Sequence, residues 1–141
     1  MNNSPLNAGA VTALGRLLLA LIFILSGFGK LMAPGPTIGF FTAVHVPVPE
    51  VAYVVSVIVE LGGGLALLLG FQARIVAALL ALFCLYTAFA VHGFASMESQ
   101  SSALKNISMT GGFLYVIAYG AGAWSIDAMR QRRGGLSAQP A

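Results

Sequence analysis

Two charged residues lie deep inside apolar stretches of this sequence, Arg16 and Glu60. If the apolar stretch that begins at residue 51 is a membrane-crossing helix, Glu60 lies about 14 Å deep. By the same count Arg16 lies about 9 Å from the opposite surface. An unpaired carboxylate at that depth costs at least a few kcal/mol, so we predict that Arg16 and Glu60 form a buried polar pair. Such a pair either fixes helix register or serves a function, and both interpretations stay open.

A second polar set lies near the other ends of the predicted helices. These residues could rim a pocket for an anionic or quinone-like head group, and they are Lys30, Glu50, His92, Lys105 and Asn106. The alternative for the two lysines is that they snorkel to the lipid head groups.

Tyr115 and Tyr119 lie one helical turn apart. We predict that they are core aromatics whose hydroxyls bond to the charged residues. His45 and His92 fall on one predicted side of the membrane, but nothing around them has the spacing of metal or haem ligands, so no metal site is predicted. Cys84 is the only cysteine, and we expect a buried, unreactive thiol. No catalytic residue is assigned.

The composition of the chain indicates which class of protein positions these side chains. The chain has 141 residues, of which 58% are hydrophobic and 8% charged, and its mean hydropathy is +0.90. Soluble domains carry about a quarter charged residues, so a soluble globule is excluded. The net charge of +3 is too small for a nucleic-acid-binding surface. The lipid bilayer is therefore the expected environment.

Four apolar segments are long enough to cross a bilayer, which takes roughly 20 residues: 10–32, 51–70, 74–93 and 107–127. The sequence thus predicts an all-α polytopic membrane protein, a bundle of four transmembrane helices over 10–128. Residues 1–9 form a short N-terminus, and 129–141 a basic, disordered tail. Four prolines between the first two segments exclude another crossing helix, so we expect Thr37–Val46 to lie at the membrane interface.

Arginines set the predicted orientation. Five lie on the side of both termini, and two lysines lie on the other side. The positive-inside rule then puts the N- and C-termini in the cytoplasm. Within each segment, small and polar residues recur at helical spacing and mark the faces that meet other helices. On the fourth segment, this face is predicted to hold Lys105, Ser108, Gly112, Tyr115 and Tyr119.

Several runs of this sequence resemble the DoxX family of small membrane proteins. They are Gly15–Phe23 with Ser26–Leu31, Pro47–Glu50, Glu60–Gly64, and Lys105-Asn106 followed by Gly111-Gly112. The resemblance covers about residues 10–128 in order. It implies a four-helix protein of the bacterial inner membrane in which Arg16, Lys30, Glu60, Lys105 and Asn106 are the family-typical polar set. The family is named after a subunit associated with a terminal quinol oxidase, and some members are linked to thiosulfate oxidation or to thiol and oxidative-stress complexes.

The sequence is compatible with three functions. The first is an accessory component of a membrane oxidoreductase or quinone-linked system, with a bound quinone and a redox partner subunit or a second copy of the chain. The second is a structural or assembly bundle without chemistry. The third is a small proton-coupled transporter that uses Glu60, although the predicted Arg16 partner and the fixed orientation argue against it. Whether the chain is an enzyme stays open.

Overall fold

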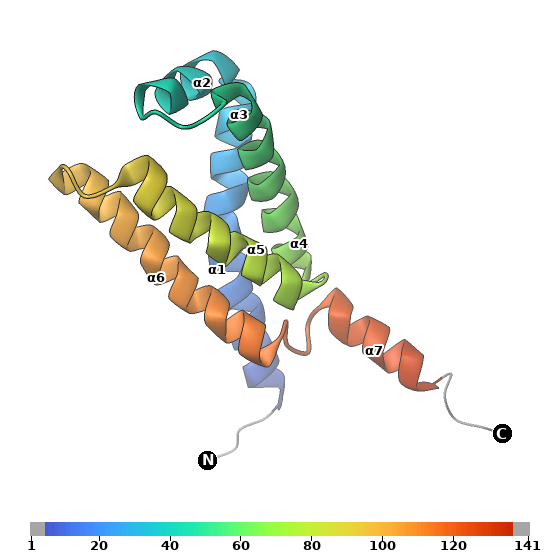
Figure 1. The fold of residues 1–141 in the computed structure, drawn as a ribbon. Coiled ribbons are helices and arrows are strands. Elements are labelled where there is room, and N and C mark those ends of the chain that lie inside the picture. Colours follow the sequence, from blue (N-terminus) through green and yellow to red (C-terminus); the bar gives the residue numbers. More distant parts are fainter. Residues whose placement is uncertain (1–4, 137–141) are drawn as a thin grey trace.

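The computed structural model describes residues 5–136, which form an all-α fold without a strand in that range (Figure 1). The α-helices are α1 Pro5–Met32, α2 Pro34–Ala43, α3 Pro49–Val57, α4 Gly63–Leu69, α5 Ala73–Tyr86, α6 Met97–Tyr119 and α7 Ile126–Leu136. Two π-helical segments complete them, η1 Ile58–Gly62 between α3 and α4, and η2 Thr87–His92 after α5. The all-α prediction is confirmed.

Three helical stretches within residues 5–136 are long and apolar enough to cross a membrane: Ala8–Met32, Pro49–Leu69 and Ala73–His92. They agree with the first three predicted segments to within two residues at each end. The second consists of α3, η1 and α4, and the third of α5 and η2. Three of the four predicted segments are therefore helices that are long and apolar enough to cross a membrane.

The fourth predicted segment, 107–127, is not one helix. Its helix, α6, begins ten residues earlier at Met97, where Ser96 and Ser99 form a capping box. It ends at Tyr119 because Gly120 and Gly122 take positive φ values of 80° and 81°. The first half of α6 is rich in serine and charge, which lowers its hydropathy below that of the other three stretches.

The C-terminal segment is also more ordered than predicted. The expected disorder over 129–141 is wrong for residues up to Leu136, because these continue α7. Ser125 begins this helix, since its hydroxyl accepts a hydrogen bond of 3.1 Å from the backbone N–H of Ala128. Residues 137–141 and residues 1–4 of the predicted N-terminal segment lie outside the described residues.

The proline-flanked segment between the first two crossing helices forms α2, which lies across one end of the bundle beside α3 (Figure 1). Pro34 occupies its first turn, where the missing N–H costs nothing. Phe41 and Val46 are buried. His45 is exposed in the turn after α2 and has a positive φ of 60°.

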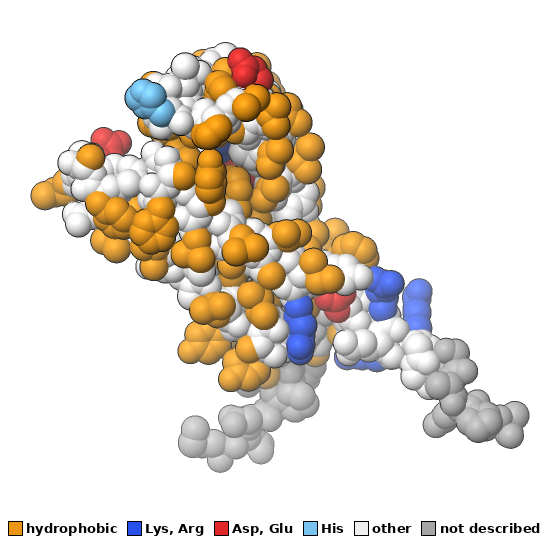
Figure 2. Space-filling view, in the orientation of Figure 1, with side chains coloured by type: hydrophobic (Ala, Val, Ile, Leu, Met, Phe, Trp, Pro, Cys, Tyr) orange, Lys and Arg blue, Asp and Glu red, His pale blue; other side chains and the backbone are white. Residues whose placement is uncertain are grey.

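The core lies where α1, α4, α5 and α6 meet. The rings of Phe23 and Phe113 lie 5.6 Å apart at its centre, and small residues such as Ala20, Ala77 and Cys84 surround them. Large apolar side chains cover the outside instead, as Figure 2 shows. Small residues inside and large apolar residues outside are typical of helices that pack together in lipid.

Candidate functional site

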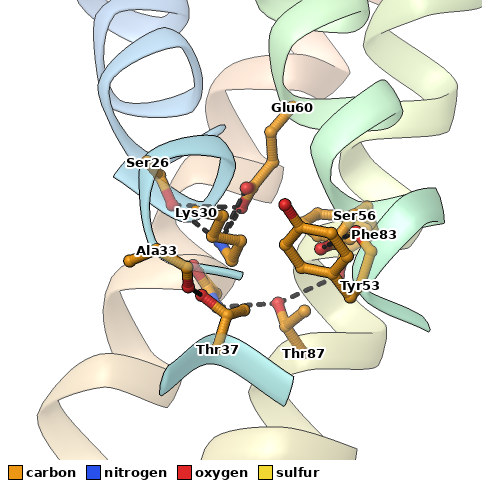
Figure 3. Close-up of polar contacts among 10 residues, drawn as sticks. Ser26, Lys30, Ala33, Thr37, Tyr53, Ser56, Glu60, Phe83 and Thr87 are labelled. Atoms are coloured by element: carbon orange, nitrogen blue, oxygen red, sulfur yellow. Dashed lines mark hydrogen bonds and ion pairs between the residues drawn. The ribbon is translucent and has the colours of Figure 1, made fainter. Parts of the chain in front are cut away.

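The salt bridge between Lys30 and Glu60 joins α1 to η1 (Figure 3). Lys30 Nζ lies 2.6 Å from Glu60 Oε2 and 2.8 Å from Oε1. Ser26 completes the group, because its hydroxyl accepts from Lys30 at 2.8 Å and donates to Glu60 Oε1 at 3.2 Å. The Glu60 side chain is 7% exposed and that of Lys30 is 21% exposed. A nearly buried carboxylate is thus neutralised by a lysine that water still reaches.

Two features bring Glu60 to this position. The first is Gly27 on α1, where an added Cβ would lie 2.9 Å from Leu61 Cγ and 3.0 Å from Glu60 Cβ. Only glycine permits so close an approach of the two backbones. The second is η1 itself, because a π-helical turn rotates the residues that it contains relative to a regular helix. Such turns are frequent at functional sites.

The predicted pairing of Arg16 with Glu60 is wrong, although both side chains are buried as expected. Arg16 Nη1 donates to the carbonyls of Leu67 at 3.1 Å and Leu68 at 3.0 Å. Its Nη2 donates to the carbonyl of Trp124. The carbonyls at the end of α4 carry partial negative charge and, with that of Trp124, bind the two terminal nitrogens of the guanidinium, whereas the buried Nε of Arg16 has no hydrogen-bond partner among the described residues.

Helix register explains the different pairing. Gly27 faces Glu60 and Leu61, and Gly64 faces Phe23 and Ile24. This antiparallel register puts Arg16 opposite the end of α4, about 15 Å along the axis from Glu60. Lys30 is the cation of α1 that faces η1.

A pocket of about 480 Å³ lies beside the Lys30–Glu60 pair, within the usual range for small-molecule sites. We call it the Lys–Glu pocket. Its polar lining consists of Ser26, Lys30, Thr37, Glu60, Thr87, His92, Ser102, Lys105 and Asn106. Its aromatic lining consists of Phe23, Phe40, Phe41 and Phe83. The second π-helical segment, η2, supplies Thr87 and His92, so both such segments border this one pocket.

Four of the five residues predicted to rim a pocket line the Lys–Glu pocket: Lys30, His92, Lys105 and Asn106. The Asn106 amide donates to the Thr87 hydroxyl at 2.9 Å, which ties α6 to η2. Lys105 is exposed and makes no hydrogen bond or salt bridge with the part of the chain described. Glu50 does not reach the pocket, because it lies exposed in the first turn of α3.

The prediction for Tyr115 and Tyr119 is wrong. They are 71% and 79% exposed, and their rings stack on each other at 6.1 Å on the outside of α6. Phe113 and Val116 face the core in their place. The inward face of α6 is therefore rotated from the predicted one.

Sequence reasoning missed the residues that close the pocket. Thr37, Phe40 and Phe41 come from α2, and no helix was predicted there. Thr87 was missed as well, because residues five apart lie on different faces of a regular α-helix, whereas the segment that holds Thr87 and His92 is π-helical. Within residues 5–136 no three His, Cys, Asp or Glu side chains lie close enough together to hold a metal ion.

An apolar groove continues from the pocket along the side of the bundle. It runs between α1 and α6 and has about 610 Å³. It shares Ile22, Lys105 and Met109 with the Lys–Glu pocket, and Leu104 and Ser108 also line it. We call it the α1–α6 groove. Lys105 thus lines both the Lys–Glu pocket and the α1–α6 groove.

Comparisons of the sequence with known proteins identify its family. The sequence model of the DoxX family matches residues 11–93, which hold α1 to η2 and therefore Lys30, Glu60 and His92. Inner membrane protein YqjF of Escherichia coli (strain K12) is 37% identical over 119 residues, 84% of this chain and 90% of the relative. Inner membrane protein YphA of the same strain is 31% identical over 120 residues, 81% of this chain and 86% of the relative. No solved structure matches. Because the family match covers more than half of the chain, this protein belongs to the DoxX family of membrane proteins.

Proposed function

We propose that this protein binds a quinone in the Lys–Glu pocket and serves as an accessory component of a quinone-linked membrane oxidoreductase. The observation that carries the proposal is the buried Lys30–Glu60 pair beside a pocket of about 480 Å³. A quinone ring is flat and apolar with two carbonyl acceptors. Four phenylalanines offer apolar contacts to such a ring, and Lys105 and Asn106 offer N–H donors to its carbonyls.

The α1–α6 groove supports a ligand that carries a long apolar chain. The groove adjoins the pocket at Lys105 and is lined mainly by apolar atoms. We propose that the chain of the quinone leaves the pocket along this groove, between α1 and α6. Because exposed leucines surround the groove on both helices, the ligand then enters from the bilayer and not from water.

The number of helices that cross the membrane and the side on which the termini lie are part of the same proposal. The helix α6 has 23 residues, a length of about 34 Å, which is enough to cross the hydrocarbon. We propose that it crosses as the fourth helix, in the bacterial inner membrane, with both termini in the cytoplasm. The support is the two inner membrane relatives and the excess of arginine on one side.

Binding of a quinone that carries a ten-carbon chain tests the proposal. The full chain is reconstituted in nanodiscs and titrated with the quinone, and extracted lipids are searched for bound quinone by mass spectrometry. We expect saturable binding that Lys105→Met and Asn106→Leu each weaken about fivefold to tenfold, since losing a hydrogen bond and leaving a carbonyl unpaired costs about 1–1.4 kcal/mol. Glu98→Gln is the control, because Glu98 is exposed on α6 and outside the pocket lining.

A substitution in the α1–α6 groove tests whether the chain of the quinone lies there. Ser108 lines the groove but not the pocket, so Ser108→Trp fills the groove and leaves every residue of the pocket lining unchanged. We expect it to weaken the chain-bearing quinone and leave a chainless benzoquinone unaffected. Absence of saturable binding of either compound to the wild-type protein, with no quinone in the extract, contradicts the proposal and favours an assembly role. Proton flux in liposomes that is lost in Glu60→Gln would favour a transporter instead.

A further inference from the structure

A second hollow lies at the opposite end of the bundle, where α5 begins and α6 ends. It has about 840 Å³, and three arginines line it, Arg74 from α5 and Arg130 and Arg132 from α7. We call it the arginine hollow. Figure 2 shows the basic side chains gathered in this region, beside the apolar surface of the bundle.

The positive charge of the arginine hollow is not neutralised by the acid within it. Both carboxylate oxygens of Asp127 accept hydrogen bonds from the start of α5, Oδ1 from Gln72 N–H at 2.9 Å and Oδ2 from Ala73 N–H at 2.8 Å. No salt bridge joins Asp127 to an arginine within residues 5–136. Three arginines therefore line the hollow, whereas its one carboxylate is already hydrogen-bonded to the backbone at the start of α5.

One of the arginines packs on an aromatic ring, and another lies beside the backbone at the end of α6. The guanidinium of Arg130 lies 5.6 Å from the centre of the Phe71 ring, a cation–π contact. Arg74 lies against the backbone of Gly120, where an added Cβ would be 3.5 Å from Arg74 Nε. Planar guanidinium groups bind phosphate oxygens through paired N–H donors, so their placement favours a phosphate group.

The position of the hollow indicates where the phosphate comes from. Arg74 is the second residue of the stretch Ala73–His92, which is long and apolar enough to cross a membrane. Tyr119 lines the hollow and is 79% exposed, and Trp124 nearby is 56% exposed. Such aromatic side chains are typical of the head-group level of a membrane. We propose that the arginine hollow binds the phosphate of an anionic phospholipid head group.

Trp124 provides a direct readout, because it is the only tryptophan of the chain and lies next to Ala123 and Ser125 of the hollow. The full chain is reconstituted with brominated phosphatidylglycerol or brominated phosphatidylcholine, and quenching of Trp124 gives their relative affinity. We expect phosphatidylglycerol to be preferred, and Arg74→Gln and Arg130→Gln each to reduce the preference about threefold to fivefold, since each removes a guanidinium that pairs with the phosphate inside the hollow.

Arg133→Gln is the matched control. It removes the same charge from the same helix, but Arg133 is exposed and does not line the hollow, so we expect the preference to be retained. An equal loss in Arg133→Gln and Arg130→Gln would overturn the proposal, because net charge alone would explain it. Equal quenching by both lipids in the wild-type protein would also overturn it. Reversal of the quenching by millimolar inorganic phosphate would assign the hollow to free phosphate and overturn the lipid source.

Discussion

The ion pair of Lys30 with Glu60 lends itself to a double-mutant cycle. Lys30→Met removes the ammonium group and keeps the length of the side chain. Glu60→Gln removes the negative charge and keeps the shape. The double variant removes both charges and leaves neither unpaired.

The structure gives the expected magnitude. Removing one partner of a buried ion pair costs about 3–5 kcal/mol, because the other charge stays buried without compensation. The Lys30 side chain is 21% exposed and that of Glu60 is 7% exposed, so water offsets part of this cost. We therefore expect each single variant to lower the free energy of unfolding by about 2–3 kcal/mol. The double variant should lose less than the sum of the two, by about 1.5–2 kcal/mol of coupling.

Unfolding in mixed micelles of lipid and sodium dodecyl sulfate, followed by Trp124 fluorescence, measures these free energies. Lys105→Met is the matched control, because Lys105 is an exposed lysine of the same pocket without a salt bridge in the described chain. We expect it to change the free energy of unfolding by less than about 0.5 kcal/mol. Additive losses from Lys30→Met and Glu60→Gln would refute the pairing. Coupling of Glu60 to Arg16 in the same cycle would refute the helix register.

Three further substitutions are expected to lower the free energy of unfolding in the same assay. Gly27→Ala should cost about 1–3 kcal/mol, because its Cβ would lie 2.9 Å from Leu61 Cγ, whereas Gly29→Ala meets nothing within 4 Å and should be neutral or stabilising. Arg16→Met should cost about 2–3 kcal/mol, because buried carbonyls at the end of α4 and at residue 124 lose their charged donor. Asp127→Asn should cost about 1 kcal/mol through the weakened cap of α5; an unchanged midpoint would contradict that role.

The bounds of the three long apolar helical stretches could be predicted because hydropathy and helix breakers agree there. Pro34 and Pro49 start helices and Gly70 ends one with a positive φ of 65°, and all three positions are visible in the sequence. The bounds of α6 were harder to predict. Its polar first half is helical because a serine capping box starts it and because it packs against α5, and tertiary contacts of this kind leave no mark on hydropathy.

The polar residues of the site were predictable, but their partners were not. Charge inside an apolar stretch is informative by itself, and Glu60 and Arg16 are indeed buried. Which cation meets Glu60 depends on the register that Gly27 and Gly64 set and on a π-helical turn. Counting the depth of each charged residue from the ends of its apolar segment does not reveal that register. The orientation of Tyr115 was mispredicted for a similar reason, since a rotation of α6 by one residue, roughly 100°, turns Val116 inward in its place.

The two cations on the inner face of α1 are compensated in different ways, and this difference separates stability from binding. Arg16 donates to main-chain carbonyls and borders no part of the Lys–Glu pocket. Lys30 is paired with a carboxylate at the wall of that pocket, and Lys105 nearby has no salt bridge within the described chain. Loss of Arg16 should therefore lower stability without changing the affinity of folded protein for the quinone. Loss of Lys105 should lower that affinity at unchanged stability. If both variants changed both quantities, the two ends of the bundle would act as one unit and this division would be wrong.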